Sequence, residues 1–201
     1  MKKKIIVILL ICICFLSGCT KKPQENPIVT MAIKDYGEIK MELYPDIAPN
    51  TVANFVNLIE DGFYDNNTFH RLVKGFVLQG GDPTATGSGG PGYTIKGEFS
   101  LNGYTNNLSH TTGIVSMARS KDKNSAGSQF FIMLSDDYTS TLDGSYAAFG
   151  KVIQGMDVIK QIEDADLELE DEELGLLKEA LTIEKATVDT KGYSYKVKKY
   201  S

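Results

Sequence analysis

The stretch from residue 68 to 152 constrains the fold most, because it is a succession of short β-prone segments. These segments are rich in β-branched and aromatic residues, and clusters of Gly, Pro, Asn, Asp and Ser separate them. They read TFHRLV, FVLQGG, YTIKGEF, GIVSMA, QFFIML and AAFGKV. Short strands at this spacing predict an all-β sandwich or barrel rather than alternating β and α units.

Four further elements frame this stretch. Strands are expected at 31–34 and 37–43, forming a hairpin, and a closing strand at 181–188. A short helix is expected over 155–162. A longer helix is predicted by apolar residues at i, i+3, i+4 and i+7 before a glycine, namely Val52, Phe55, Val56 and Ile59. A chain of 201 residues suits one sizeable domain, which we place at 31–190.

The first residues have the pattern of a secretory signal. Lys2 to Lys4 precede an apolar run from Ile5 to Phe15, which is too short to span a membrane comfortably. The run ends in Leu16-Ser17-Gly18-Cys19, which resembles the lipobox of bacterial lipoproteins. We therefore expect residues 1–18 to be removed and Cys19 to carry acyl chains. The alternative is an ordinary cleaved signal with an incidental cysteine.

Residues 19–30 are polar, contain Pro23 and Pro27, and show no periodicity, so they are interpreted as a tether. Two or more acyl chains on Cys19 would anchor it stably. The expected location is the extracytoplasmic face of the cell membrane, with the lipid as the only membrane contact. All three cysteines lie in residues 12–19, so the domain itself cannot form a disulfide.

The composition and motifs exclude several classes of function. The net charge of −5 argues against a nucleic-acid-binding face. No nucleophile elbow and no metal-ligand spacing of His or Cys occurs, so we expect neither a metal nor a cofactor. The glycine-rich run 87–92 lacks the Gly-Lys-Ser/Thr of a phosphate cradle and contains Pro91, so it is interpreted as a loop.

A strongly acidic segment and a basic tail stand near the C-terminus. Residues 163–173, EDADLELEDEE, carry eight carboxylates in eleven residues, without the spacing or glycine of a calcium loop. A solvated insert is the favoured interpretation over a partner-binding patch. The tail 191–201 is basic, and the sequence leaves open whether it folds back on the acidic insert or extends freely.

Arg71 is unusual in a chain whose basic residues are almost all lysines. It is one of two arginines and lies beside one of two histidines, His70, in an apolar β-prone segment. Arginine does not lose its proton, so it can orient or stabilise developing electron density but cannot act as a base. On an alternating strand His70 would point away from Arg71, which favours a structural role for the histidine.

Ordered motifs across residues 31–188 resemble the cyclophilin-type peptidyl-prolyl cis-trans isomerases. They are Phe69-His70-Arg71, Lys74-Gly75-Phe76, Gln79-Gly80-Gly81-Asp82, Gly113, Ser116-Met117-Ala118, Gly127-Ser128-Gln129-Phe130-Phe131-Ile132, Leu142-Asp143-Gly144 and Phe149-Gly150. The resemblance implies a closed eight-stranded antiparallel barrel capped by an α-helix at each end. It also implies an enzyme that accelerates rotation about the X-Pro peptide bond.

The resemblance further implies the roles of individual residues. Arg71 would be catalytic, with Gln79 orienting it and contacting the substrate carbonyl. A second set would bind the substrate, comprising a proline cup and a grip on the extended peptide: Phe76, Val77, Met117, Ala118, Arg119, Gln129, Phe131, Leu142 and Tyr146. His110 is expected to be structural.

Two positions depart from the common family pattern. Thr141 stands where many cyclophilins carry Trp, and Tyr146 where many carry His. The tyrosine still offers a flat wall and a hydroxyl, so catalysis should survive, whereas losing the indole N–H puts strong cyclosporin binding in doubt.

Three functions follow as hypotheses from the sequence. The favoured one is a monomeric isomerase that acts on proline-containing polypeptides while exported proteins fold. The second is a module or chaperone that binds proline segments without turnover, and the third is an adhesin-like surface lipoprotein. A group suited to a twisted amide has no use in a pure binder, so Arg71 favours the enzyme.

Overall fold

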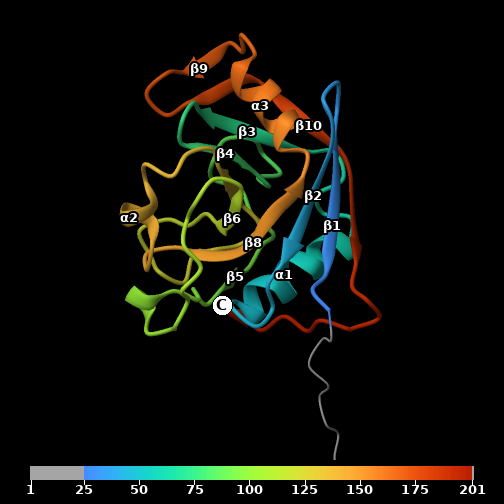
Figure 1. The fold of residues 1–201 in the computed structure, drawn as a ribbon, viewed down its shortest axis with the longest axis vertical. Coiled ribbons are helices and arrows are strands. Elements are labelled where there is room, and N and C mark those ends of the chain that lie inside the picture. Colours follow the sequence, from blue (N-terminus) through green and yellow to red (C-terminus); the bar gives the residue numbers. More distant parts are fainter. Residues whose placement is uncertain (1–24, 201) are drawn as a thin grey trace, which may run out of the picture.

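The computed structural model describes residues 25–200, so the expected signal peptide, Cys19 and the first part of the tether lie outside it. Eight antiparallel strands follow the order β1-β2-β8-β6-β7-β4-β3-β10, and β1 also pairs with β10, which closes the barrel (Figure 1). Helix α1 lies at one end and helix α3 at the other. This confirms the expected closed barrel with a helix at each end.

The barrel strands are β1 (Ile28–Ile33), β2 (Gly37–Leu43), β3 (Asn67–Val73), β4 (Val77–Gly80), β6 (Ile114–Met117), β7 (Phe130–Met133), β8 (Ala147–Gln154) and β10 (Leu176–Asp189). Outside the barrel lie β5 (Thr94–Ile95), β9 (Leu169–Asp171), β11 (Lys199–Tyr200) and the 3-10 turn Ser100–Asn102. The helices are α1 (Pro49–Glu60), α2 (Thr139–Leu142) and α3 (Met156–Asp164).

Helix α1 closes its end of the barrel with an aromatic cluster. Its buried Phe55 lies 5.0 Å from the ring of Tyr64, 5.1 Å from Phe130 and 5.0 Å from Phe149, measured between ring centroids. Tilted and edge-to-face contacts at such distances add stability beyond the burial of apolar area. The helix is therefore fixed relative to β8 and to β7, and β7 also supplies Phe131 to the candidate site.

A buried glutamate from outside the helix caps the start of α1. The Glu98 carboxylate, 6% exposed, accepts from the backbone N–H groups of Asn50 at 3.1 Å and Thr51 at 2.8 Å, and from the Thr51 hydroxyl at 2.7 Å. Pro49 in the first turn has no N–H that needs a partner. A negative charge at this end also favours the helix dipole.

Replacing Glu98 by alanine should therefore lower the free energy of unfolding by about 2 kcal/mol, because buried N–H groups lose a charged acceptor. Urea unfolding of the purified chain measures this change. Glu60→Ala is the control, since Glu60 is exposed at the end of the same helix and should change stability by less than about 0.5 kcal/mol. Equal stability losses for the two variants would contradict the capping role.

The structure differs from the expected element boundaries at three places, one of which is that β10 begins at Leu176 and not at residue 181. Strand β1 begins at Ile28, so three residues assigned to the tether belong to the barrel, where they pair with β2 and β10. The expected strand at 93–99 is reduced to the two residues of β5, which pair with β11 rather than with the barrel. In that segment Ile95 and Phe99 still pack into the hydrophobic core, but β5 is not hydrogen-bonded to a barrel strand.

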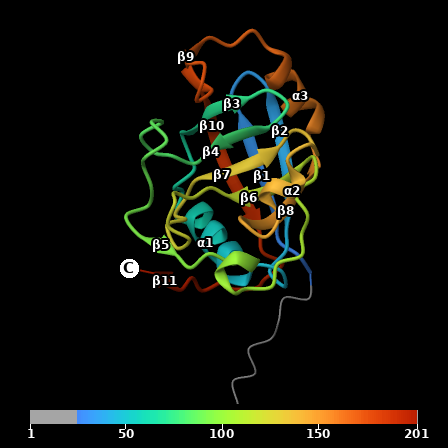
Figure 2. The same cartoon turned by 90° about the vertical axis from the view of Figure 1, so that its left-hand side faces the viewer.

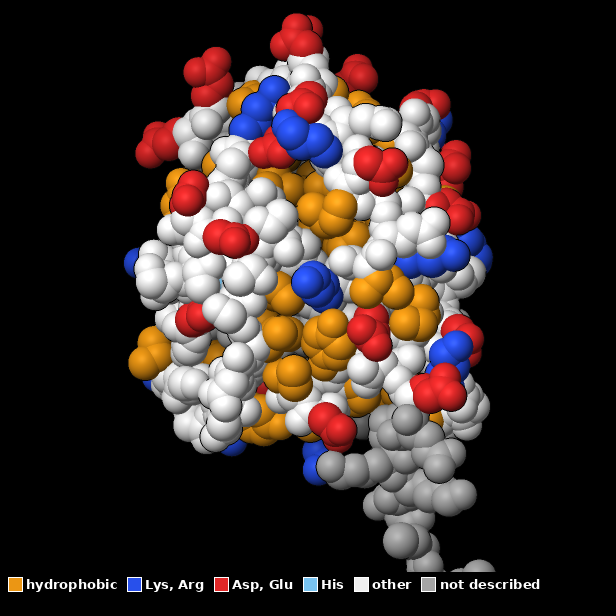
Figure 3. Space-filling view, in the orientation of Figure 1, with side chains coloured by type: hydrophobic (Ala, Val, Ile, Leu, Met, Phe, Trp, Pro, Cys, Tyr) orange, Lys and Arg blue, Asp and Glu red, His pale blue; other side chains and the backbone are white. Residues whose placement is uncertain are grey.

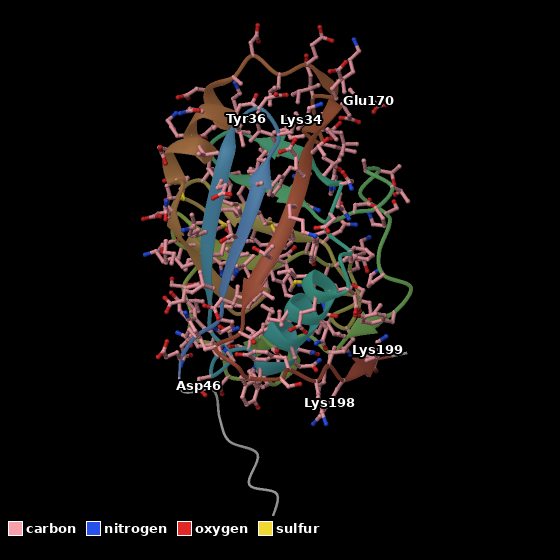
Figure 4. The ribbon with its side chains drawn as sticks, turned by 90° about the vertical axis from the view of Figure 1, so that its right-hand side faces the viewer. Lys34, Tyr36, Asp46, Glu170, Lys198 and Lys199 are labelled. Atoms are coloured by element: carbon pink, nitrogen blue, oxygen red, sulfur yellow. The ribbon has the colours of Figure 1, made fainter. Side chains whose placement is uncertain are left out.

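The acidic insert and the basic tail lie at opposite ends of the molecule. Glu170 of β9 is at one end, and Lys198 and Lys199 are at the other (Figure 4). Figure 3 shows acidic side chains gathered at the upper end, over the region where Figure 1 places β9. The tail instead follows α1, where the Asn50 side chain donates to Lys198 O at 3.0 Å and Asn57 to Tyr195 O at 3.1 Å.

Within residues 25–200 no helix is both long enough and apolar enough to cross a membrane.

Candidate active site

A β-bulge in β3 determines the direction of Arg71. Phe69 pairs with Gly80 of β4, but Arg71 pairs with the adjacent Gln79, so His70 is an extra residue on β3. Regular alternation would point Phe69 and Arg71 to the same face, whereas Phe69 is fully buried in the barrel and Arg71 is only partly buried. The bulge therefore turns Arg71 outward while His70 stays buried, which agrees with the expectation that these two side chains point apart.

Two hydrogen bonds hold the Arg71 guanidinium. Nη1 donates to Gln79 Oε1 at 3.1 Å, and Nε donates to the backbone oxygen of Leu174 at 2.6 Å. Burial lowers the pKa of Arg71, and Tyr146 nearby raises it, but an arginine stays charged at any working pH. Among residues 25–200, Nη2 donates no hydrogen bond.

The hydrogen bonds continue from Arg71 through two glutamines to the glycine-rich loop. Gln79 Nε2 donates to Gln129 Oε1 at 2.9 Å. Gln129 Nε2 in turn donates to Gly87 O at 3.1 Å and Gly89 O at 2.9 Å. In this series of hydrogen bonds each amide oxygen accepts and each amide nitrogen donates. The side-chain amides of both glutamines are therefore fixed in orientation. The structure thus brings Arg71, Gln79 and Gln129 together, as the resemblance implied.

An apolar cluster lies beside this polar chain and is separate from the barrel interior. Phe131 is 5% exposed and meets the Tyr146 ring edge-to-face at 5.8 Å, and Phe76 lies 4.3 Å from the Tyr138 ring. Figure 2 shows the contributing strands β4, β7 and β6 side by side, with α2 in front of them. The cluster includes Phe76, Val77, Ala118, Phe131, Leu142 and Tyr146, which are six of the nine predicted substrate-binding residues.

Met117 does not belong to this cluster. Strand β6 alternates, so Met117 points into the barrel, where it is 1% exposed and packs in the interior core. Ser116, its neighbour, lies on the other face and bonds to His110. The prediction that Met117 flanks the proline cup was wrong, because the side-chain parity of β6 places it behind the barrel wall.

Ala118 and Arg119 lie on a groove next to the polar chain. This groove has a volume of about 600 Å³ and is also lined by Gln79, Gln129 and the glycine-rich loop. The Arg119 side chain is held by the protein itself, because Nε and Nη2 donate to Ser145 O at 3.0 and 2.8 Å. Its guanidinium also lies 4.6 Å from the Tyr146 ring, so the side chain supports the wall of the groove.

A buried histidine supports Phe131 from behind. The His110 ring is stacked with the Phe131 ring at 6.2 Å, and its nitrogens contact Asp143 Oδ1 at 2.8 Å and Ser116 Oγ at 2.9 Å. Burial lowers the pKa of His110, although Asp143 acts in the opposite direction. The ring has partners for both nitrogens, which agrees with the structural role expected for it.

Sequence reasoning missed three contributors to the site. Leu174 contacts Arg71 through its backbone, and no side-chain pattern indicates a carbonyl. Tyr138 stands in a turn before α2, and Asp143 was noted only as part of a motif. For Asp143, a possible pairing with His110 was the one signal available in the sequence, but the two residues are 33 positions apart, so the sequence does not show that they meet.

No group of three or more His, Cys, Asp or Glu side chains suited to a metal ion occurs in residues 25–200.

His70 is buried, at 1% exposed, and neither ring nitrogen has a hydrogen-bond partner among the described residues. Burial lowers its pKa, Asp82 raises it and Arg71 lowers it. The pKa of His110 is also lowered, so the folded chain binds fewer protons than the unfolded chain below about pH 6.5. The free energy of unfolding should therefore fall as the pH drops from about 7 towards 5.

His70→Leu should reduce this pH dependence and raise stability at pH 7, because it removes an unpaired polar ring from the interior. Urea unfolding at several pH values between about 7.5 and 5 compares the variant with the unaltered chain. If the variant lost as much stability on acidification as the unaltered chain, His70 would not contribute to the pH dependence.

Comparison with known proteins identifies relatives of this arrangement. Residues 28–188 match the family model described as cyclophilin type peptidyl-prolyl cis-trans isomerase/CLD. Peptidyl-prolyl cis-trans isomerase B of Bacillus subtilis is 47% identical over 135 residues, covering 67% of this chain and 90% of the relative. Peptidyl-prolyl cis-trans isomerase CYP18-2 of Arabidopsis thaliana is 43% identical, covering 70% and 84%.

Among solved structures, a cyclophilin-type isomerase of Cryptosporidium parvum, crystallised in the presence of the dipeptide Ala-Pro, superposes with a TM-score of 0.70. It is 34% identical, and the match covers 81% of this chain and 98% of that one.

Proposed function

Because the chain belongs to the cyclophilin-type peptidyl-prolyl cis-trans isomerase family, we propose that its groove at Arg71 isomerises X-Pro bonds of exported proteins outside the cytoplasm. The single observation that carries the catalytic assignment is the guanidinium of Arg71, held by Gln79 at the edge of an apolar cluster. Relatives named as isomerases favour turnover over the alternative of a binding module without catalysis.

The reaction needs electrostatic help rather than covalent chemistry. Rotation about X-Pro breaks amide resonance, with a barrier of about 20 kcal/mol and a relaxation time of tens of seconds. Many turnovers per second require the barrier to fall by about 6 kcal/mol, since each factor of ten takes about 1.4. In the twisted state the proline nitrogen regains its lone pair and becomes a hydrogen-bond acceptor, which the planar amide is not.

Arg71 is suited to that developing acceptor. Its Nε and Nη1 are bound to the protein, which leaves Nη2 for the substrate. A charge-assisted hydrogen bond formed only in the twisted state lowers the barrier by about 1.5 to 3 kcal/mol. The charge of Arg71 is partly desolvated, so it acts on the nitrogen more strongly than it would in water.

The apolar cluster supplies the remaining reduction of the barrier by holding the proline. Its ring would lie against Phe131, with Phe76 and Leu142 around it, while the polar chain of Gln79 and Gln129 faces the peptide backbone. Fixing the residues on both sides of the bond leaves only the carbonyl free to rotate. The Ala-Pro dipeptide present with the Cryptosporidium relative supports a proline-containing peptide as the ligand class.

The location follows from residues outside the described part of the chain. A lipid on Cys19 and a tether of about eight residues before β1, reaching at most about 26 Å, would keep the groove near the extracytoplasmic surface, where exported chains fold. No further protein chain is needed for the site, so we propose a monomer.

The anchor and the activity are tested separately. Cells expressing the full chain are fed labelled palmitate and fractionated, and Cys19→Ser should lose the label and leave the membrane. The purified chain is then mixed with a proline tetrapeptide at low temperature, where uncatalysed relaxation takes minutes, and should accelerate it. If the unaltered chain took up no palmitate label, the lipid anchor would be contradicted. If the purified chain did not accelerate relaxation of the peptide, the isomerase activity would be contradicted.

A further inference from the structure

The acidic insert folds into a hairpin that docks beside Arg71. Strand β9 pairs with the start of β10, and Leu176 of β10 pairs with Arg71 of β3. At the hairpin turn, Leu174 O accepts from Arg71 Nε at 2.6 Å, and Gly175 O accepts from the backbone N–H of Leu72 at 2.9 Å. Figure 2 shows β9 above β3, at the edge of the face that carries the site. Two successive carbonyls of the turn therefore bind two successive residues of β3.

The turn is built so that these carbonyls keep their positions. Asp171 accepts from the N–H of Leu174 through its side chain at 2.9 Å and from that of Gly175 through its backbone at 2.8 Å. Gly175 has a φ of +71°, and an added Cβ would lie 2.6 Å from Leu72 O. Only glycine lets the turn approach β3 this closely.

The other end of the insert is fastened to the turn between β3 and β4. The Glu163 carboxylate accepts from the backbone N–H of Gly75 at 2.7 Å, and Lys74 Nζ donates to Ala165 O at 3.0 Å. Within the hairpin, Lys178 Nζ contacts Glu168 at 2.6 Å. Residues 163–178 are thus tied at two separate points, to β3 itself and to the turn that follows it.

On this basis, and resting on the proposed isomerase function, we infer that the β9–β10 hairpin is a positioning element for Arg71 through the carbonyl of Leu174. An arginine side chain has several rotatable bonds, and one hydrogen bond to Gln79 leaves the guanidinium able to swing about Nη1. A second hydrogen bond, from Nε to the carbonyl of Leu174 in the hairpin turn, fixes the plane of the guanidinium. The hairpin would thereby hold Nη2 where the twisted proline nitrogen needs it.

The carboxylates of the hairpin do not position the Arg71 guanidinium. Glu172 and Glu173 are exposed, so water and salt screen their charges at the guanidinium. The inference concerns the backbone of the turn, which separates it from the charge of the insert. Neutralising these side chains and displacing the turn should consequently have different results.

Gly175→Ala is the main variant, because its Cβ forces the turn away from Leu72 and so moves the Leu174 carbonyl. We expect kcat/KM to fall about tenfold, with the affinity for a proline peptide changed less than twofold. In the same protein the Arg71 Nε–H should lose its protection from hydrogen exchange, observed by nitrogen NMR. Asp171→Ala, which loosens the same turn without a clash, is the second variant and should change both quantities in the same direction.

Two controls are matched to this change. Gly192→Ala puts the same residue at another positive φ, +74°, with no atom within 4 Å of the added Cβ, and should leave catalysis unchanged. The double variant Glu172→Gln, Glu173→Gln removes charge without moving the turn and should retain kcat/KM within twofold.

A double-mutant cycle with Arg71→Lys identifies the pathway of the effect. Lysine has no Nε–H fork to hold, so Gly175→Ala should cause no additional loss in that background. An equal loss in both backgrounds, an unchanged Nε–H, or a full loss from the charge variant would overturn the inference. An inert unaltered chain would instead refute the proposed function, so the two failures are distinguishable.

Discussion

Arg71→Ala is expected to lower kcat/KM for a proline tetrapeptide by about 100-fold or more while the chain remains folded. The reason is that Arg71 offers the only cationic fork held by Gln79 at the apolar cluster among residues 25–200. Its side chain is partly exposed, so truncation leaves a wet gap rather than a cavity in the core. The loss should appear mainly in kcat, since the bond forms in the twisted state.

The measurement is the relaxation of the tetrapeptide at low temperature, with circular dichroism to verify folding. Arg71→Lys keeps the charge but lacks the rigid fork, and it should recover only a minor part of the activity. Full activity of the alanine variant would show that the catalytic group lies elsewhere. Full activity of the lysine variant would show that charge alone is enough.

Phe131→Ala is expected to abolish measurable peptide binding and to lower the free energy of unfolding by about 3 kcal/mol. Phe131 is 5% exposed and contacts both His110 and Tyr146, so its removal opens a cavity under the proline cup. Isothermal titration with a proline peptide and urea unfolding of the same preparation measure the two effects.

Phe130→Leu is the matched control, because Phe130 precedes Phe131 on β7 and points to the barrel interior instead. It should cost about 1 kcal/mol or more of stability yet leave peptide affinity unchanged. If both variants retained affinity, the proline cup would be misplaced. If both lost it, binding would report general destabilisation rather than the side chain of Phe131.

The candidate site could be predicted from sequence where a side chain has unusual chemistry for its neighbourhood. Arg71 stood out in this way, whereas Gln79 was assigned through the family resemblance, and the structure joins the two by a hydrogen bond. The prediction that Met117 lies beside the proline cup was wrong, because a motif indicates which residues are near the site but not which face of the strand each one occupies. Leu174 was not predictable, since it acts through a backbone oxygen that every residue possesses.

Most of the barrel strands, both main helices and the all-β class were determined by the sequence itself, because turn residues and apolar periodicity act within a few positions of the chain. Only the tertiary structure decided the closure of β1 on β10, the bulge at His70 that turns Arg71 outward, and the docking of the hairpin on β3. These features depend on contacts between residues far apart in the chain. Local preference does not encode such pairings, and packing selects among them only when the whole barrel forms.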